Sequence, residues 1–154
     1  MTGQRTYLVI MDETPEASLA LRFAARRAAR TRGTVHILAL VPRQDFSLFG
    51  GVQATIEAEA RERAEMVVTT AAGGLVSEVG LTPVIAVRQG DGAREVTAYL
   101  ADHPEVSALV LGIAKEGGPG PLVTHFAGNS AAKLPCPLML VPGNLAEDDL
   151  DRLS

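Results

Sequence analysis

The sequence predicts a single α/β domain in which helices connect the strands of an open, mainly parallel sheet. The first observation is that short apolar segments alternate with amphipathic segments of helical period along the chain, as in successive strand–helix–strand units. The second is that 154 residues, 47% of them hydrophobic, suffice for one domain with a substantial core. The third is that neither an internal repeat nor a linker divides the chain. We therefore expect one sheet and one folded unit.

Five segments have the composition of buried strands. Tyr7–Met11 is a continuous apolar run, which is typical of a strand covered on both faces. The second and fourth strands stop at Pro42 and Gly112, residues that interrupt regular structure. The predicted strands are residues 7–11, 35–41, 82–88, 106–111 and 137–141.

The first two predicted helices have clear start and stop signals. The first begins with Thr14 as its cap and Pro15 at its first position, and it ends near Gly33. The second follows a loop over residues 43–51 and repeats apolar residues every three or four positions. We expect it to break or end near the glycine pair at 73–74.

Two more helices are predicted in the second half of the chain. A short helix follows the glycine-rich turn at residues 90–92, and a further helix spans residues 122–134. The segment 144–154 is polar and acidic, and we expect it to fray as a tail.

Composition excludes several classes of protein. The net charge of −4 disfavours nucleic acid and anionic membranes as partners. No apolar run is long enough for a membrane helix and no secretory signal is visible, so a soluble, cytoplasmic protein is expected. Cys136 is the single cysteine, and the three histidines show no ligand spacing with it. No disulfide framework and no metal site are therefore predicted.

Several motifs occur in a characteristic order along the chain. They are Asp12 at the end of the first strand, the helix start Thr14-Pro15-Glu16-Ala17-Ser18, the strand ending Leu40-Val41, the segment Leu109-Val110-Leu111-Gly112, and the C-terminal Leu134-Pro135-Cys136-Pro137-Leu138-Met139-Leu140-Val141. With these motifs the chain resembles the universal stress protein family over nearly its whole length. The resemblance implies a Rossmann-like domain over residues 1–143 with the strand order 3-2-1-4-5 and helices on both faces. It also implies homodimers and, in one branch of the family, ATP bound without an obvious catalytic apparatus.

The candidate ligand site lies between the ends of the first and fourth strands. The helices that follow these strands leave on opposite faces, and a crevice opens at such a point in an open sheet. Asp12 and Gly112 should border it, and a carboxylate there can accept hydrogen bonds from an adenine amine or from ribose hydroxyls. The resemblance places Asp12 near the adenosine and the backbone of Val41 against the base. The alternative reading is that Asp12 is a turn residue and Val41 a buried strand end.

The phosphate-binding stretch of the family is damaged in this chain. The ATP-binding branch has Gly, two residues, Gly, nine residues, Gly and then Ser or Thr. After Gly112 the second glycine position holds Lys115. An alternative register pairs Gly118 with Gly128, but it displaces the hydroxyl to Ser130. Prolines at 119 and 121 each remove a backbone donor. We expect weak or absent ATP binding, and the competing interpretation is a rigid structural loop.

Three functions compete for this sequence. The favoured one is a non-catalytic, dimeric stress-response module with a degenerate nucleotide site, for which ATP or another adenine nucleotide is the candidate ligand. The alternative is an ATP- or AMP-binding universal stress protein with slow hydrolysis. A phosphoacceptor receiver domain would need an aspartate after strand three and a lysine after strand five, where Arg88-Gln89 and Val141-Pro142 stand.

The predicted partner is a second copy of the chain. The segment 137–142 carries no charge, although in the implied strand order it forms an edge of the sheet. We therefore expect a homodimer through this strand.

Overall fold

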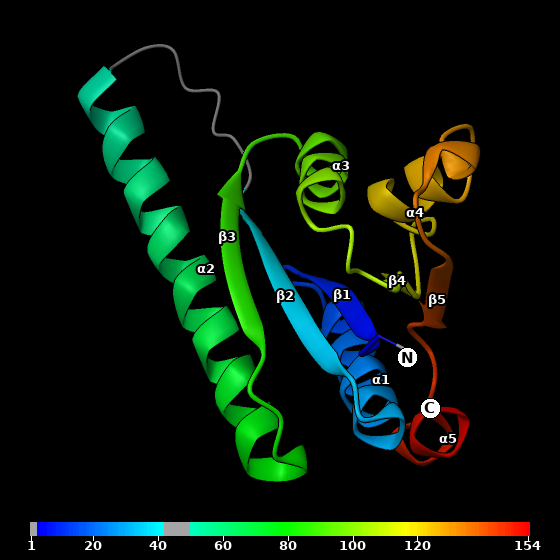
Figure 1. Cartoon of the computed structure of the whole chain (residues 1–154). Coiled ribbons are helices and arrows are strands. Elements are labelled where there is room, and N and C mark those ends of the chain that lie inside the picture. Colours follow the sequence, from blue (N-terminus) through cyan, green and yellow to red (C-terminus); the bar gives the residue numbers. More distant parts are fainter. Residues whose placement is uncertain (1–2, 42–49) are drawn as a thin grey trace.

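The computed structural model of the chain describes residues 3–41 and 50–154, with side chains in the second range from residue 55 onward. Five parallel strands form one sheet in the order β3-β2-β1-β4-β5 (Figure 1). The predicted fold class and strand order are thus confirmed. The strands are β1 (Thr6–Met11), β2 (Thr34–Val41), β3 (Val84–Gln89), β4 (Ala108–Ile113) and β5 (Leu138–Pro142).

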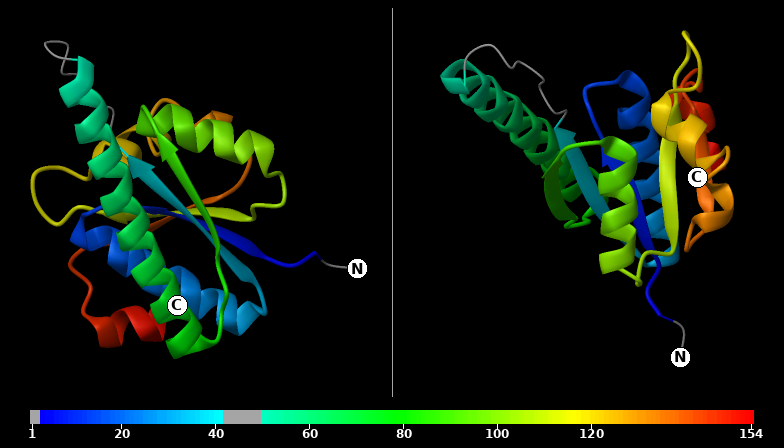
Figure 2. Two further views of the ribbon diagram at one scale, coloured as in Figure 1. Left: turned by 90° about the vertical axis from the view of Figure 1, so that its left-hand side faces the viewer. Right: turned by 90° about the horizontal axis from the view of Figure 1, so that it is seen from above.

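The core has two layers, one on each face of the sheet, and successive side chains of β1 contribute to them in turn. The side chains of Tyr7 and Val9 pack on the side of helices α1 (Pro15–Thr31) and α2 (Gly50–Val79). Leu8 packs on the opposite side, with α3 (Gly92–Asp102) and α4 (Pro121–Phe126). Successive residues of a strand face opposite sides of the sheet, so one buried strand serves both layers. Figure 2 shows the helices on the two faces.

Helix α2 does not break at its glycine pair. It continues through Gly73 and Gly74 to Val79. Each glycine inside a helix costs about 0.5–1 kcal/mol relative to alanine. Ala72 and Leu75, which flank the pair, are buried, and their burial offsets that cost. Most of the predicted 43–51 loop lies outside the described residues.

The predicted helix over residues 122–134 is wrong. Helix α4 ends at Phe126, a turn follows, and a single 3₁₀ turn spans Ala131–Lys133. Gly128 and Asn129 interrupt the helix because both residues are weak helix formers. The helical spacing of apolar residues extends from Phe126 to Leu134 because both residues pack on the same core layer, although they do not belong to one helix.

The expectation that the C-terminal segment frays is also wrong. Residues Glu147–Leu153 form helix α5, which packs against α1. Leu150 is fully buried in the core layer beneath α1 and α2. The acidic composition concealed this helix because the carboxylate that faces the protein, Asp151, is neutralised by Arg22 and Arg26, which are far away in the sequence. In the described part of the chain no helix is both long and apolar enough to cross a membrane.

Candidate functional site

Asp12 stands at the point where the chain leaves the sheet. It follows β1, whose neighbours are β2 on one side and β4 on the other. One carboxylate oxygen, Oδ1, accepts a hydrogen bond from the backbone N–H of Thr14 at 2.9 Å and another from the Thr14 hydroxyl. Oδ2 has no hydrogen-bond partner among the described residues. Asp12 therefore stabilises the turn into α1 and still presents one free oxygen to solvent.

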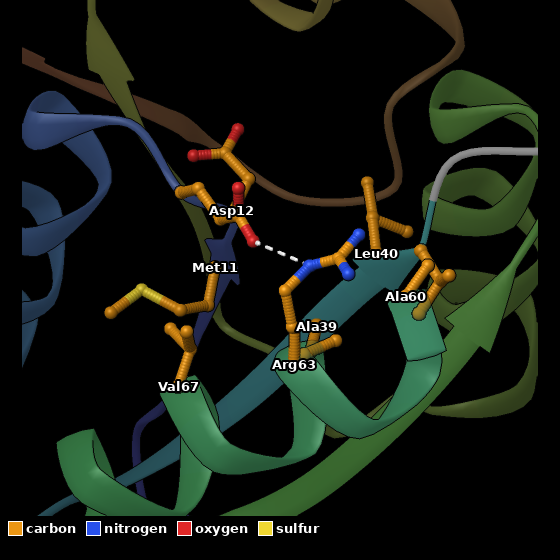
Figure 3. A pocket seen from close by; sticks show the side chains of 10 residues that line it. Met11, Asp12, Ala39, Leu40, Ala60, Arg63 and Val67 are labelled. Atoms are coloured by element: carbon orange, nitrogen blue, oxygen red, sulfur yellow. Dashed lines mark ion pairs between the residues drawn. The ribbon is translucent and has the colours of Figure 1, made fainter. Parts of the chain in front are cut away.

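A cavity of about 220 Å³ opens on the β2 side of Asp12 (Figure 3). We call it the β2-side cavity. It lies between the ends of β1 and β2 and the inner surface of α2. Its walls are mainly apolar, and its mouth carries two acids and one arginine. The described residues that line it are Met11, Asp12, Glu13, Ala39, Leu40, Val41, Ala60, Arg63, Ala64 and Val67.

Polar groups are confined to the rim of the β2-side cavity. Arg63 Nε lies 3.7 Å from Glu13 Oε1, and both side chains are largely exposed. Exposed ion pairs of this kind are weak and easily rearranged. At the inner end, Val41 is fully buried, and its carbonyl accepts a hydrogen bond from the backbone N–H of Gly90 at 3.1 Å. The cavity thus combines an apolar interior with an adjustable charged rim.

The sequence analysis missed the helical wall of this cavity. Ala60, Ala64 and Val67 belong to the apolar repeat of the second helix, so their burial was expected but their place beside Asp12 was not. Arg63 also lines the cavity, although it was not among the predicted site residues. The available signal was the small size of Ala60 and Ala64, which leaves space between a helix and a sheet.

A second, smaller cavity of about 90 Å³ opens on the β4 side of Asp12. We call it the β4-side cavity. Among the described residues that line it, Asp12 and Glu16 are acidic and none is basic. These residues are Ile10, Asp12, Thr14, Glu16, Leu111, Gly112, Pro119, Gly120, Pro121, Leu122 and Val123.

Gly112 has a packing role at the β4-side cavity. A Cβ atom at this position would collide with the backbone carbonyl of Glu16 in the first turn of α1. The close approach of β4 to α1 therefore requires glycine, whether or not a ligand is present. A glycine at the end of this strand is consequently weak support for phosphate binding.

The remaining predicted site residues do not converge on the crevice. Lys115 and Gly118 lie in the exposed loop after β4, which the hydrogen bond from Ala114 N to the Pro119 carbonyl closes at 3.1 Å. Gly128 and Ser130 follow α4, and none of these four residues lines either cavity. The structure brings together only Asp12, Val41 and Gly112 from the predicted set.

Away from the crevice, burial shifts the pKa values of two titratable side chains. Burial, with a contribution from the nearby His103, lowers the pKa of His36, whose Nδ1 lies 2.8 Å from the Tyr99 hydroxyl oxygen. Burial raises the pKa of the Cys136 thiol, which disfavours a nucleophilic thiolate. Within the described ranges no three His, Cys, Asp or Glu side chains cluster as metal ligands would.

The sequence model of the Universal stress protein family matches residues 4–142. The chain belongs to the universal stress protein family. No curated protein matches it significantly in sequence. Similar solved structures include the universal stress protein UspA from Lactobacillus plantarum, with a TM-score of 0.78 and 16% identity over 91% of this chain and 99% of that chain.

Two other similar structures hold nucleotides. The universal stress protein from Archaeoglobus fulgidus, in complex with dAMP, has a TM-score of 0.56 and 19% identity over 92% of this chain and 99% of that one. A universal stress protein family member from Arabidopsis thaliana with AMP bound has a TM-score of 0.53 and 15% identity over 94% of each chain. At these identities the likeness establishes the fold.

Proposed function

We propose that this universal stress protein is a non-catalytic binding module that holds an adenine nucleoside or a weakly charged adenine nucleotide in the β2-side cavity. The observation that carries the proposal is the chemical contrast between the two cavities beside Asp12. One is apolar inside with a polar rim, and the other is small and acidic. Relatives of the same fold have been solved with AMP, dAMP and cAMP, which supports adenine as the base.

The β2-side cavity suits the base and the ribose. A flat apolar base can lie between the strand ends and the small residues Ala60 and Ala64 of α2. Ligand sites of this type use an apolar interior for affinity and a few polar groups for orientation. The free Oδ2 of Asp12 can accept a hydrogen bond from a ribose hydroxyl or from the adenine amine. Asp12 thus has both a turn role and a ligand role in this proposal.

The β4-side cavity is poorly suited to a triphosphate. Phosphates favour backbone N–H groups and cations, whereas Asp12 and Glu16 place two carboxylates here. Pro119 and Pro121 contribute no N–H group. Lys115, the cation of the adjacent loop, does not line the cavity. Phosphoryl transfer would require preorganised positive charge around the phosphates, so we assign the protein to binding rather than to hydrolysis.

Calorimetry with adenosine, AMP and Mg-ATP tests the proposal. We expect adenosine and AMP to bind more tightly than ATP, whose dissociation constant should be no tighter than about 100 μM, roughly −5.5 kcal/mol. Low-micromolar ATP binding, or release of phosphate from ATP, would favour the alternative of an ATP-binding protein with slow hydrolysis.

Substitution of Asp12 tests the assigned contact. Asp12→Ala should weaken adenosine binding by about 1.5–3 kcal/mol, the usual scale for a hydrogen bond to a charged group. Thr14→Ala is the matched control, because it disturbs the same turn and keeps the carboxylate. Equal losses in the two variants would show that Asp12 acts only through the turn.

We also propose that the protein dimerises through β5. This strand is one edge of the sheet, carries no charge, and exposes Leu140 to 38%. Edge strands that stay unpaired normally carry a charge or another blunting feature. The opposite edge, β3, contains Arg88 and therefore has such a charge. Pairing of β5 with its copy would satisfy the edge through two-fold symmetry.

Sedimentation velocity at micromolar concentration tests the dimer. Leu140→Lys should produce a folded monomer, because like charges would face each other across the two-fold axis. Ile85→Lys on the opposite edge strand is the control and should remain dimeric. A monomeric parent protein would contradict the proposal.

A further inference from the structure

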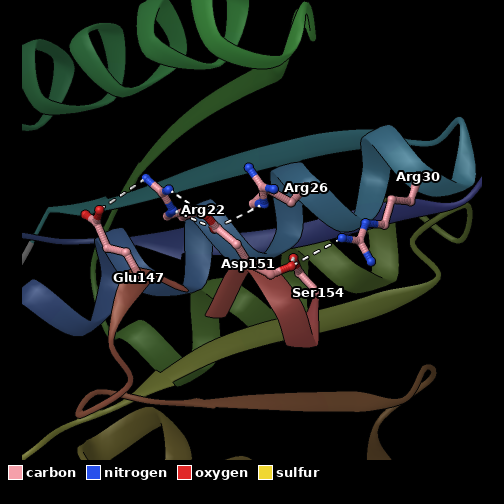
Figure 4. Close-up of polar contacts among 6 residues, drawn as sticks. All are labelled: Arg22, Arg26, Arg30, Glu147, Asp151 and Ser154. Atoms are coloured by element: carbon pink, nitrogen blue, oxygen red, sulfur yellow. Dashed lines mark hydrogen bonds and ion pairs between the residues drawn. The ribbon is translucent and has the colours of Figure 1, made fainter. Parts of the chain in front are cut away.

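One face of α1 carries a row of arginines that α5 covers. Arg22, Arg26 and Arg30 are spaced four residues apart and therefore share one side of the helix. We call these three residues the arginine face. Figure 4 shows them turned toward α5. Glu16 is the only acidic residue of α1, so the helix itself does not neutralise this face.

Asp151 is the principal contact of α5 with the arginine face. Its carboxylate accepts two hydrogen bonds from Arg22, from Nε to Oδ1 and from Nη2 to Oδ2, each of 2.9 Å. Arg26 Nε lies 3.1 Å from the same Oδ1, and Arg30 Nη2 donates to the Asp151 backbone carbonyl at 3.3 Å. The hydrogen bond and charge of Arg22 lower the pKa of Asp151, as expected of an ion pair that forms in the folded state.

Helix α5 satisfies the hydrogen-bonding groups of the arginine face only in part. A single carboxylate serves two guanidinium groups, and Arg26 Nε is buried without a well-aligned hydrogen bond among the described residues. Among the described residues, Arg30 donates a hydrogen bond to a backbone carbonyl and has no carboxylate partner. Glu147 Oε2 lies 3.9 Å from Arg22 Nη1, at the limit of an ion pair. A ligand whose second carboxylate reaches Arg26 or Arg30 could satisfy the face better than α5 does.

Helix α5 is weakly attached. It has seven residues, which is too short for a helix that is stable on its own. Its anchors are two buried side chains, Leu150 and Ser154, a hydrogen bond from Arg27 Nη1 to the Ser154 carbonyl, and ion pairs that remain partly exposed to solvent. It also lies outside residues 4–142, the part that matches the family. Elements held by so few buried contacts open at low free-energy cost while the core stays folded.

We propose that α5 is a displaceable cover, and that the arginine face beneath it binds an acidic amphipathic helix of a partner protein. Helix α5 itself shows the chemistry that fits, a buried leucine beside a carboxylate that faces the arginines. The partner would supply a leucine-like anchor and two carboxylates one helical turn apart. This interaction is independent of the nucleotide crevice.

A peptide of residues 144–154, labelled with fluorescein, is a probe for the uncovered face. Fluorescence anisotropy would measure its binding to the full-length parent protein and to the full-length variants Asp151→Asn and Asp148→Asn. Asp148 is exposed and makes no ion pair within the described ranges, so it is a charge-matched control. A closed cover lowers the apparent affinity by the fraction of open protein, so Asp151→Asn should bind the probe about tenfold more tightly than the parent and the control.

Two further measurements make the result decisive. Adding Arg22→Gln to Asp151→Asn should abolish binding, and a probe with Asp151→Asn in its own sequence should bind poorly. Hydrogen exchange should be faster at residues 147–154 in the Asp151→Asn protein and unchanged in β1, which shows opening of α5 without loss of the fold.

Several outcomes would overturn the proposal. Equal affinity of the probe for the two single variants, unchanged exchange in α5, or binding that survives Arg22→Gln would each do so. Binding of phosphatidylserine vesicles or DNA by Asp151→Asn, without binding of the probe, would assign the face to another class of partner. New self-association of that variant, reversed by the unlabelled peptide, would identify the α5 of a second copy as the occupant.

Discussion

The two cavities beside Asp12 share a carboxylate and a strand end but differ in almost every other respect. The β2-side cavity has the small residues Ala60 and Ala64 on its helical wall. The β4-side cavity is narrowed by the close approach of Gly112 to the Glu16 backbone and is lined by a second acid. Strand order positions the crevice, whereas the side chains on each flank decide which chemical groups can occupy it.

The difference between the cavities has a packing origin. On the β4 side, β4 and α1 approach so closely that Gly112 has no space for a Cβ atom. Gly143 is similarly confined by the Ile113 carbonyl. On the β2 side, α2 is held at a distance where two alanines leave a gap. The β2-side cavity therefore has space for a ligand between α2 and the strand ends.

The largest expected effect is on stability, at Gly112. Gly112→Ala should lower the free energy of unfolding by about 2–3 kcal/mol, because the added methyl group meets backbone that cannot move cheaply. Urea denaturation measures the change. Gly73→Ala is the matched control, since a Cβ there has open space, and it should stabilise α2 by about 0.5–1 kcal/mol. A neutral Gly112→Ala would mean that this glycine is not needed for packing.

The next effect concerns ligand binding on the β2 side. Ala64→Leu fills the β2-side cavity and should weaken adenosine binding by tenfold or more, which is about 1.4 kcal/mol. Leu122→Phe fills the β4-side cavity instead and should leave adenosine affinity nearly unchanged. Calorimetry on both variants, with thermal unfolding as a check of folding, compares the two sides directly. If Leu122→Phe weakened adenosine binding more than Ala64→Leu, the ligand would be assigned to the β4-side cavity.

The smallest expected effect is electrostatic. Glu16→Gln removes one negative charge from the β4-side cavity and should strengthen ATP binding by about two- to threefold at low salt, with less effect at high salt. Adenosine binding should not change, because adenosine carries no phosphate. An equal gain for both ligands would show that the two cavities are not chemically distinct.

Much of the fold followed from local sequence patterns. Continuous apolar runs such as Tyr7–Met11 identified buried strands, and Thr14-Pro15 marked the start of α1. These signals are local because a strand covered on both faces must be apolar throughout. The order 3-2-1-4-5 came from the resemblance to a family, since local periodicity does not say which strands are neighbours. The structure confirmed that order.

The candidate site was only partly predictable. Asp12 and Gly112 were found because they lie at predicted strand ends, and parallel strands end at the same edge of a sheet. Val41 was found through the resemblance to the family. Lys115, Gly118, Gly128 and Ser130 were selected by comparison with the glycine motif of the family, and they line neither cavity. The contribution of α2 to the site was missed because no local pattern states which sheet position a helix covers.

By itself, the sequence determined the positions of the five strands and of helices α1 to α3, because those properties depend on neighbours in the chain. Only the tertiary structure decided whether the acidic C-terminal segment is folded or solvated. Its carboxylate at Asp151 pairs with Arg22, 129 positions away, and Leu150 enters the core beside α1. An acidic segment is solvated when its charges lack partners and folds when distant arginines neutralise them. Local composition cannot distinguish the two cases, because the compensating charges are brought together only by the fold.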